Sequence, residues 1–510
     1  MRILDLLKTK SEEEEGLSFE RKRAIKMQYK TLRKLVSKGA ITDYGKRYGF
    51  SSILAEEDIY NSYSKNVPIT NYETLYPWWQ RAYNGEHDVC WPGKVDYFAL
   101  SSGTSEGASK YIPVTNDMLK SIKKASLKQI ISIAKTDMPK DYLTKHYLMI
   151  AGSVDLEFNG INYSGDLSGI TTQNLPFWFE RFSKPDRSIR KERNWESKLE
   201  QISANAKDYD VAMIAGVPAW IQILFEDIIE RYNLNNIHDI WPNLSVYIHG
   251  GVSITPYKNS LNKLLGKPIM YFETYLASEG FIGFQNKIDS KGMNLLFNNG
   301  IFYEFIPFNR ENFNESGELL DNPMVLRLED IEEDQEYALL LTTCTGAWRY
   351  MLGDVIKFTE LDKNSFIITG RTKHFLSLCG EHLSVDNMTK AIDLTSNHFN
   401  TNMQEFTVKG IPYKGKFAHE WYIGCEDENL NIKQVKEVLD VNLKALNDDY
   451  KTERGQALKE IVLHLIPNRI FLEFLSHKGK TGAQTKFPRV LTDSLFAEWK
   501  EFIEQRETMV

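Results

Sequence analysis

The segment Ser101–Lys110 (SSGTSEGASK) holds the densest set of side chains suited to binding an anion. Its glycines let backbone N–H groups turn toward a phosphate, while its hydroxyls and Lys110 add hydrogen-bond donors and positive charge. The spacing differs from that of a Walker loop, because Lys110 is followed by tyrosine and not by serine or threonine. Taken alone, the segment is equally compatible with a phosphate site and with a flexible Ser/Gly turn.

Three later segments carry groups that suit a nucleotide. Tyr275–Glu279 (YLASE) offers a ring for a purine and a carboxylate for Mg²⁺, unless it is only a strand end with a solvated glutamate. Trp348–Asp354 (WRYMLGD) places Asp354 where it can bind ribose hydroxyls or pair with Arg349. Lys478–Arg489 (KGKTGAQTKFPR) is either a mobile lysine-bearing loop or a solvated basic linker.

Several other kinds of site are disfavoured by the residue pattern. The cysteines Cys90, Cys344, Cys379 and Cys425 form no C-x-x-C pair, so zinc and redox sites have little support. Four scattered thiols suit a reducing compartment. There is no H-E-x-x-H pair, which argues against a metalloprotease-type site.

The bulk properties predict a multidomain cytoplasmic protein. The 510 residues exceed what one hydrophobic core usually supports. A net charge of -7 argues against a chain that coats nucleic acid. Residues 1–10 contain no secretory signal, and the longest apolar run, 211–225, is too short to span a membrane. We expect neither a nucleic-acid nor a membrane partner, and the oligomeric state cannot be read.

The elements expected around the first segment are a strand and a helix. Val95–Leu100 is strand-like and precedes the Ser/Gly segment. Thr115 and Asn116 resemble a helix cap, and apolar residues recur at helical spacing up to Ala134. Strand, polar loop and helix in this order predict a βα unit of an α/β domain.

Further strands end in loops that can share one crevice. Leu244–His249 ends in Gly250 and Gly251, Ile269–Phe272 leads into Tyr275, and 210–225 breaks at Gly216 before continuing as helix. Ligands of α/β sheets bind off the carboxyl ends of strands, which predicts a common site.

The texture of the sequence changes in its second half. Short β-rich runs dominate from about 300 to 369, around a charged, loop-like stretch at 309–334, and another strand-and-helix region follows. We place a domain boundary near 370, which gives a large domain (1–370) and a small C-terminal domain (371–510).

The order of these motifs resembles that of adenylate-forming enzymes. SSGTSEGASK, YLASE, WRYMLGD, the hinge-like GRTK at 370–373 and TGAQTKFPR follow one another as the motifs of that superfamily do. The HGG turn after WPNL, the RY-x-x-GD form and GEHLSVDN at 380–387 resemble the auxin-responsive (GH-three) family of acyl acid amido synthetases, in its bacterial form. The resemblance spans about 70–490. It implies an α/β fold, with a large adenylate-forming domain of mixed α/β sheets plus a β-rich subdomain, and a small α+β C-terminal domain.

The resemblance also implies roles for individual residues. The ATP site would comprise Ser101, Ser102, Gly103, Thr104, Ser105 and Lys110 at the phosphates, Gly250, Gly251 and Tyr275 at the adenine, Ser278 at the α-phosphate and Asp354 at the ribose. Glu279 would help to hold Mg²⁺. Arg371 would face the nucleotide, and Lys486 would be the catalytic lysine that the small domain brings in.

Two positions depart from the family pattern. Trp348 stands where the family usually has tyrosine, and no lysine matches near 387–389, so Lys486 is the lysine that we assign to adenylation. The acid pocket would include Gly169, Phe177 and Trp220. The rings of Phe177 and Trp220 suggest an aromatic or apolar acyl group, unless they are simply part of the core.

The implied reaction has two steps. A small carboxylic acid attacks the α-phosphorus of ATP, and an amine, that of an amino acid in this family, then displaces AMP to form an amide. No general base is needed in the first step, because the carboxylate is already ionised near neutral pH. The alternatives are an acyl-CoA ligase with the same first step and a non-catalytic acyl- or nucleotide-binding protein on this scaffold.

Overall fold

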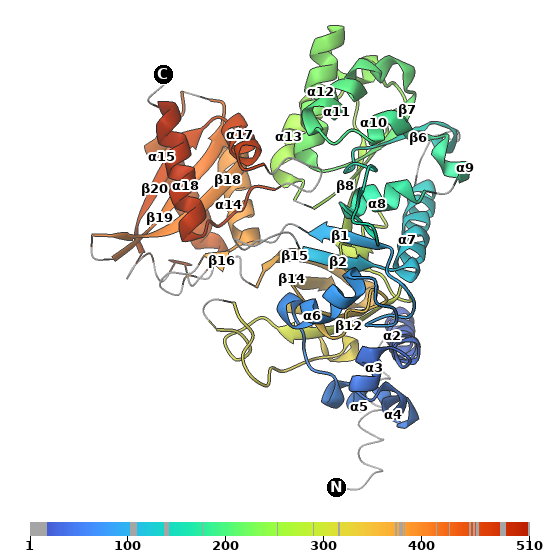
Figure 1. Cartoon of the computed structure of the whole chain (residues 1–510). Helices are drawn as coiled ribbons and strands as arrows, with labels where there is room; N and C mark the ends of the chain where they lie inside the picture. The colour runs from blue at the N-terminus through green and yellow to red at the C-terminus, as the bar shows by residue number, and fades with distance from the viewer. Residues whose placement is uncertain are drawn as a thin grey trace.

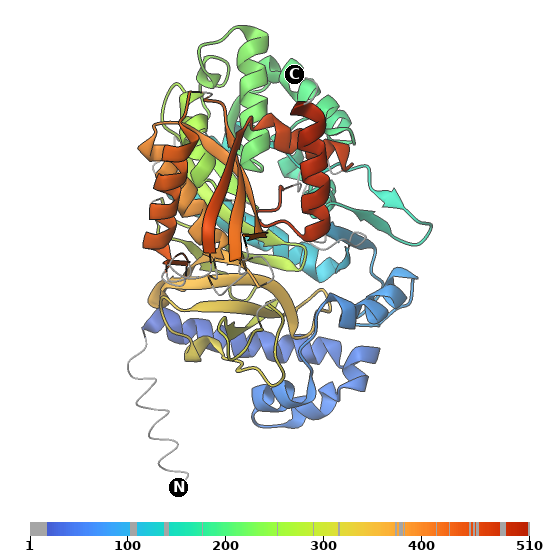
Figure 2. The same cartoon turned by 90° about the vertical axis from the view of Figure 1, so that its left-hand side faces the viewer.

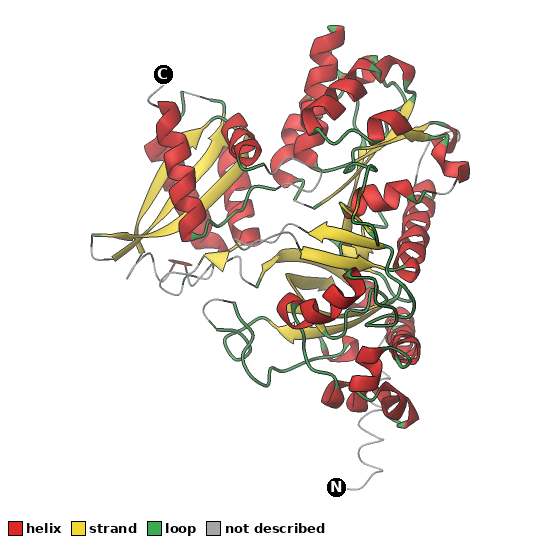
Figure 3. Cartoon of the chain, viewed as in Figure 1, coloured by secondary structure: helices red, strands yellow, loops and turns green. Residues whose placement is uncertain are grey.

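The computed structural model of the chain describes residues 18–101, 110–136, 142–175, 177–251, 253–288, 290–314, 317–372, 375–376, 381, 383–414, 416–427, 429–447, 450–451, 454, 458–479 and 486–507. Helices surround several β-sheets, and a C-terminal part stands beside the main body (Figure 1, Figure 3). A search of the described residues finds no helix with the length and apolar character that membrane crossing requires.

The largest sheet forms the centre of the main body. Within the described residues it has 11 strands, in the order β12 (Ile301–Pro307), β13 (Glu336–Thr343), β14 (Tyr350–Glu360), β15 (Ser365–Arg371), β11 (Met293–Leu295), β10 (Gly280–Phe284), β9 (Met270–Ala277), β8 (Val246–Gly250), β7 (Val211–Ala215), β3 (His146–Met149) and β6 (Ser183–Lys184). The strands from β9 to β6 pair in parallel, and the others pair antiparallel. The continuous apolar strand β7 is buried along its whole length, as expected for a parallel strand covered on both faces.

Helices cover both faces of the parallel half. On one face, Ile133 of α7 (Asn116–Ala134) packs in a cluster with Met213, Ile248 and Phe272. The other face packs against α11 (Trp195–Ala204), α12 (Pro218–Tyr232) and α13 (Thr255–Lys263). The predicted helix cap is confirmed, since the Thr115 hydroxyl accepts a hydrogen bond of 3.1 Å from the Met118 N–H.

A smaller sheet corrects one prediction. Its strands are β2 (Lys110–Val114), β1 (Tyr97–Ser101), β5 (Tyr163–Gly165) and β4 (Glu157–Phe158), in that order. The Ser/Gly segment therefore joins two antiparallel strands, with Ser101 opposite Lys110, and does not lead directly into a helix. The prediction missed β2 because its residues, KYIPV, were assigned to the loop, although tyrosine, isoleucine and valine favour strands.

The remaining elements of the main body lie around these sheets. The α-helices among them are α2 (Phe19–Gly39), α3 (Asp43–Arg47), α4 (Phe50–Ala55), α5 (Ile59–Asn66), α6 (Tyr72–Tyr83), α8 (Leu167–Gln173), α9 (Phe177–Glu180) and α10 (Arg187–Arg190). Short 3₁₀ helices occupy Tyr142–Thr144, Ala206–Asp208, Ile237–Asp239, Leu328–Asp330 and Leu361–Lys363.

The C-terminal part has its own sheet and cores. A sheet of β18 (Met403–Tyr413), β19 (Lys416–Cys425) and β20 (Leu458–Ile466) packs with α14 (Val385–His398), α15 (Ile432–Leu446), α17 (Arg469–His477) and α18 (Asp493–Glu507) (Figure 2). A short hairpin, β16 (Phe375–Leu376) and β17 (Leu383–Ser384), precedes them. The fold class expected from the sequence is confirmed. The boundary near 370 stays a prediction, and it falls where β15 ends.

Candidate functional site

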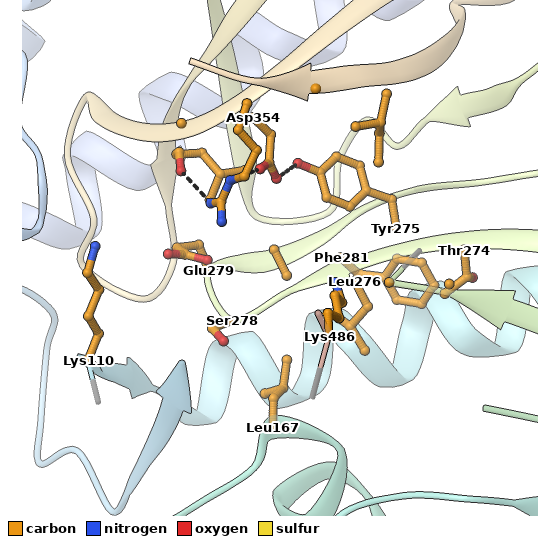
Figure 4. A pocket seen from close by; sticks show the side chains of 18 of the residues that line it. Lys110, Leu167, Thr274, Tyr275, Leu276, Ser278, Glu279, Phe281, Asp354 and Lys486 are labelled. Carbon is orange, nitrogen blue, oxygen red and sulfur yellow. Dashed lines mark hydrogen bonds and ion pairs between the residues drawn. The ribbon is translucent and has the colours of Figure 1, made fainter. Parts of the chain in front are cut away.

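A cleft of about 3080 Å³ opens at the carboxyl ends of the parallel strands. Gly216 after β7, Gly250 and Gly251 at β8, and Tyr275 on β9 all line it, together with residues of the C-terminal part. The structure therefore brings together the strand-end loops that the sequence predicted to share a crevice. Figure 4 shows the predicted residues Lys110, Tyr275, Ser278, Glu279, Asp354 and Lys486 around one cavity.

Asp354 of β14 is held by two partners, Arg371 on the neighbouring strand β15 and Tyr275 on the more distant strand β9. The Tyr275 hydroxyl donates a hydrogen bond to its carboxylate, and Arg371 Nε lies 2.8 Å from its Oδ1 (Figure 4). Asp354 and Arg371 stand opposite each other in the β14–β15 register, so the sheet itself sets their pairing. Burial raises the Tyr275 pKa well above its usual value, which keeps the hydroxyl protonated as a donor.

Arg349 lies away from Asp354 and does not pair with it. Its guanidinium donates to the Glu304 carboxylate at 3.0 and 3.1 Å, and both side chains are buried. It also donates to two backbone carbonyls, those of Ser64 and Val67. The alternative ion pair between Arg349 and Asp354 is therefore wrong, because Asp354 is committed to Arg371.

Trp348 is a core residue. Its indole N–H donates to the Cys90 carbonyl at 3.1 Å, and its ring packs edge-on against Phe50 at 4.7 Å. The ring also fills the space beside Gly39, where a Cβ would come within 2.6 Å of it. Tryptophan at this position thus serves packing, and no hydroxyl is needed there.

Glu279 and Ser278 form the tight turn between β9 and β10. Glu279 is only 7% exposed, and this burial raises its pKa to about 7. The nearby Asp354 carboxylate adds to the rise, whereas Arg371 and Lys110 oppose it. A carboxyl in this state accepts a cation readily, because the cation compensates the cost of burying the charge.

The donor set fits Mg²⁺ shared with a ligand better than a caged metal. Within the described residues, no group of three or more His, Cys, Asp or Glu side chains is placed to hold a metal ion. Mg²⁺ is commonly bound by one or two carboxylates, with phosphate oxygens and water completing its octahedron. Glu279 and the adjacent Ser278 hydroxyl supply oxygen donors of that kind.

Lys486 reaches the cleft from the C-terminal part. Its Cε and Nζ lie 3.2 and 3.3 Å from the point where a Cβ on Gly251 would stand. Gly251 has a φ of 85°, and a side chain there would be strained and would push the lysine away. Protein atoms surround the Lys486 amine and lower its pKa to about 8, with Arg371 contributing to the fall and Asp354 opposing it. The side chain keeps solvent contact through the open cleft.

The start of β2 places Lys110 at the edge of the cleft. Its ammonium lies 5.1 Å from the centre of the Tyr72 ring, and its charge acts on Glu279. Ser101 ends β1, whereas Ser102, Gly103, Thr104 and Ser105 lie outside the described residues. Binding of phosphates by that segment therefore stays a prediction.

Two of the predicted acid-pocket residues, Gly169 and Trp220, are not among the described residues that line the cleft. Gly169 lies inside α8, where a Cβ would come within 2.2 Å of the Ser153 carbonyl, so it permits close packing. Trp220 packs edge-on against Trp195 at 5.0 Å beside the core formed by α11 and α12. Phe177 begins α9, and its side chain lies outside the description. The cleft wall in this region comprises Met149, Ile150, Leu167, Leu175 and Phe179.

Two buried carboxyls in the cleft were missed by the sequence reasoning. Burial raises the pKa of Glu273, two residues before Tyr275 on β9, to about 7. Burial also raises the pKa of Asp166, which is opposed by the charge of Lys198. The available signal for Glu273 was a charged residue directly after the predicted strand Ile269–Phe272, since a strand that continued through it would bury a charge, which is rare without a partner or ligand.

Family models match most of the chain. The N-terminal domain of the GH3 family matches residues 15–157 and 155–270, its central domain 294–368 and its C-terminal domain 386–494.

Individual relatives and solved structures match over nearly the whole length. Indole-3-acetic acid-amido synthetase GH3.4 of Arabidopsis thaliana is 22% identical, with 91% of this chain and 89% of the relative covered. Jasmonoyl–L-amino acid synthetase JAR6 of Nicotiana attenuata is 22% identical, with 91% and 90% covered. The structure of GH3.15 acyl acid amido synthetase superposes with a TM-score of 0.75 at 17% identity, covering 94% of both chains. A 2-hydroxyisobutyryl-CoA ligase in its postadenylation state gives a TM-score of 0.60 at 13% identity, covering 95% of this chain and 92% of that chain.

Proposed function

This chain belongs to the GH3 family, and on that premise we propose that it activates a carboxylic acid with ATP and transfers the acyl group to the amine of an amino acid. One observation carries the proposal. Glu279, Asp354 and the Lys486 amine converge on one cleft although they come from distant parts of the chain. The curated relatives named above are synthetases that join an acid to an amino acid, which supports the same activity here.

The nucleotide lies across the carboxyl ends of β8 and β9. Its adenine sits between the Gly250–Gly251 turn and Tyr275, and Asp354 accepts hydrogen bonds from the ribose hydroxyls. Both Asp354 oxygens already have protein partners, which fixes the carboxylate in place before the nucleotide arrives. The phosphates extend toward Ser278, Lys110 and the Ser101–Ser105 segment.

Glu273 forms hydrogen bonds with one edge of the adenine. Its carboxyl lies on the same strand face as Tyr275 and is half-buried in the cleft wall. With a pKa near 7, it accepts a hydrogen bond when ionised and both donates and accepts when protonated. Adenine offers one donor and one acceptor on that edge, so either state makes at least one bond.

The first step needs positioning and charge neutralisation, because a carboxylate is a weak nucleophile. Its oxygen bonds to the α-phosphorus, and the bond to the β-phosphate oxygen breaks, releasing pyrophosphate. The Lys486 ammonium, with Arg371 nearby, stabilises the negative charge that builds up at the α-phosphate. Glu279 would hold Mg²⁺, which would supply charge neutralisation at the departing phosphates.

The second step is attack of the amine on the acyl carbon. The amine nitrogen forms the amide bond, AMP leaves with its mixed-anhydride oxygen, and the amine releases protons to solvent. We assign the chain a large domain of residues 1–370 and a small domain of residues 371–510. The small domain turns about Gly370–Arg371, at the end of β15, between the two steps.

The acid binds against the part of the cleft wall that lies beyond the α-phosphate. That wall is apolar at Met149, Ile150, Leu167 and Phe179, so it favours an acid with an apolar body. Asp166 is an ionisable residue in the same wall, and it favours acids that carry a hydrogen-bond donor.

Acid-dependent exchange of labelled pyrophosphate into ATP tests the first step. A panel of aromatic and aliphatic acids is offered with Mg²⁺, and at least one acid should support exchange. ATP binding without exchange for any acid would favour a non-catalytic binding protein.

A product assay tests the acceptor. The best acid is supplied with ATP and an equimolar set of amino acids and CoA. An N-acyl amino acid is the expected product. A thioester as the main product would make the chain an acyl-CoA ligase.

A further inference from the structure

A buried cluster joins the C-terminal part to helix α13. Glu405 of β18 accepts a hydrogen bond from the Tyr257 hydroxyl of α13 and lies 2.7 Å from Arg489 Nη1. Tyr257 is 3% exposed, and the Glu405 and Arg489 side chains are each 14% exposed. One carboxylate therefore bonds at once to the main body and to the segment that follows Lys486.

The segment around Arg489 is fixed to β18 on its other side. The Val408 N–H donates to the Arg489 carbonyl at 2.9 Å, and the Leu491 N–H donates to the Val408 carbonyl at 3.0 Å. Phe487 packs edge-on against Phe471 at 4.9 Å in a small-domain core. Residues 487–491 therefore move with β18 as one piece, and Lys486 moves with them.

A second polar contact lies beside the first. Gln404, next to Glu405, donates to the Gln222 amide oxygen of α12 at 2.9 Å and to the Ser260 hydroxyl of α13. Gln404 is only 7% exposed. Buried polar groups are costly when unpaired, so these side chains favour the one arrangement in which they meet.

Both ends of this network lie next to the atoms that meet in the cleft. On one side, α13 begins at Thr255, shortly after the Gly251 position that faces the Lys486 amine. On the other side, Arg489 closely follows Lys486 in the segment held by β18. A bond between Tyr257 and Glu405 therefore fixes the distance between Gly251 and Lys486.

We propose that Tyr257, Glu405 and Arg489 form an inter-domain latch that holds Lys486 at the nucleotide for adenylation and opens for amide formation. The three are positioning residues, since they act through Lys486; of them, only Arg489 is among the described residues that line the cleft. The inference rests on the proposed function for its kinetic consequence only. The structural consequence, a preferred domain arrangement, holds independently of it.

The half-reactions separate this role from a general structural one. The latch contributes to pyrophosphate exchange, which needs Lys486 in the cleft. It does not contribute to the reaction of a preformed acyl-adenylate with an amine, which needs the small domain to have turned. A variant that merely loosens the fold slows both.

The test variant is Tyr257→Phe, which removes one hydroxyl and keeps the ring and the Glu405–Arg489 pair. Its matched control is Tyr271→Phe, because the Tyr271 hydroxyl donates to Asn262 at 2.8 Å within the main body. Exchange should fall about tenfold in Tyr257→Phe, as expected for losing one hydrogen bond to a charged group. Reaction of synthetic acyl-adenylate with the amine should be unchanged or faster, and Tyr271→Phe should match the wild type in both.

Equal slowing of both half-reactions, or no slowing of exchange, overturns the proposal. If no acid supports pyrophosphate exchange by the wild type, X-ray scattering of the same full-length proteins provides the test. The Tyr257→Phe radius of gyration should then exceed those of the wild type and Tyr271→Phe. Absence of exchange in the wild type would count against the proposed function alone, whereas identical scattering of all three proteins would overturn the latch.

Discussion

The two walls of the cleft are built by different means. Tyr275, Asp354 and Arg371 stand on strands of one sheet; strand register sets Asp354 opposite Arg371, and Tyr275 reaches Asp354 from β9. Lys486 belongs to the C-terminal part and meets Gly251 only because that part docks on α13. The first wall is therefore set once the sheet folds, whereas the second depends on how the C-terminal part docks, an arrangement that we propose changes between the two steps. A site built in this way can use one bound nucleotide for two successive reactions.

The most direct test of this difference removes the Lys486 side chain, which the docked C-terminal part supplies. Lys486→Ala should lower acid-dependent pyrophosphate exchange by about 100- to 1,000-fold, because a charge aimed at the reacting phosphate is lost. The melting temperature should not change, since the side chain projects into the cleft. Amide formation from preformed acyl-adenylate should continue. Near-normal exchange in this variant would reject the assignment of Lys486.

Removing a carboxylate from the sheet wall should have a somewhat smaller effect on rate and a distinct effect on stability. Glu279→Gln should lower exchange about 100-fold and raise the Mg²⁺ concentration needed for activity. Unlike Lys486→Ala, it is expected to gain stability at alkaline pH. Exchange at the wild-type rate, with unchanged Mg²⁺ dependence, would show that Glu279 does not serve the metal.

The stability gain follows from the direction of the Glu279 pKa shift. The folded-state pKa of about 7 lies above the unfolded value, so the unfolded state loses its proton first as pH rises. Stability of the wild type therefore falls between about pH 4 and pH 7 and then levels off. Glutamine does not titrate, so it avoids this loss. Relative to the wild type, the free energy of unfolding of Glu279→Gln should therefore be up to about 3 kcal/mol higher at pH 8 than at pH 4. Urea titrations at both pH values measure the difference, and parallel pH dependence of the two proteins would contradict it.

The pH profile of pyrophosphate exchange tests both walls at once, because a group from each wall is expected to set one limb of the profile. On kcat/KM, the acid limb should lie near pH 7, where Glu279 ionises, and the alkaline limb at or above pH 8, where Lys486 loses its proton. Activity changes about tenfold per pH unit along each limb. Lys486→Arg should remove the alkaline limb, since arginine stays protonated, and leave the acid limb in place. An alkaline limb at the same pH in that variant would assign it to another group.

The smallest expected effect concerns Glu273. Glu273→Gln should raise the KM for ATP about three- to tenfold with little change in kcat, because one hydrogen bond to the base is altered while the reacting atoms are untouched. The preference for ATP over GTP should fall by a similar factor. A change in kcat alone would move Glu273 from nucleotide recognition to the chemistry.

Local patterns in the sequence predicted much of this molecule. The helix after Thr115, the strand–helix break at Gly216 and the strand ending in Gly250 are all present, because caps, glycines and apolar spacing act over a few residues. The cleft residues Tyr275, Glu279 and Asp354 were found through motif order.

Contacts between distant segments could not be predicted in the same way. Arg349 forms an ion pair with Glu304 on β12, and Asp354 forms one with Arg371. Both depend on the pairing of β-strands, which no local pattern specifies. Trp220 was assigned to the acid pocket because an aromatic residue looks alike in a pocket and in a core. Only its neighbour Trp195, on another helix, distinguishes the two.

The central claim is that one cleft forms an acyl-adenylate and then an amide. The most direct measurement uses an acid labelled with ¹⁸O in its carboxylate, supplied with ATP and the amino acid acceptor, and mass analysis of the nucleotide products. One carboxylate oxygen becomes the bridge to the α-phosphorus, so one ¹⁸O should appear in AMP and none in pyrophosphate. Label in inorganic phosphate together with ADP would mean activation at the γ-phosphate, and would contradict the account.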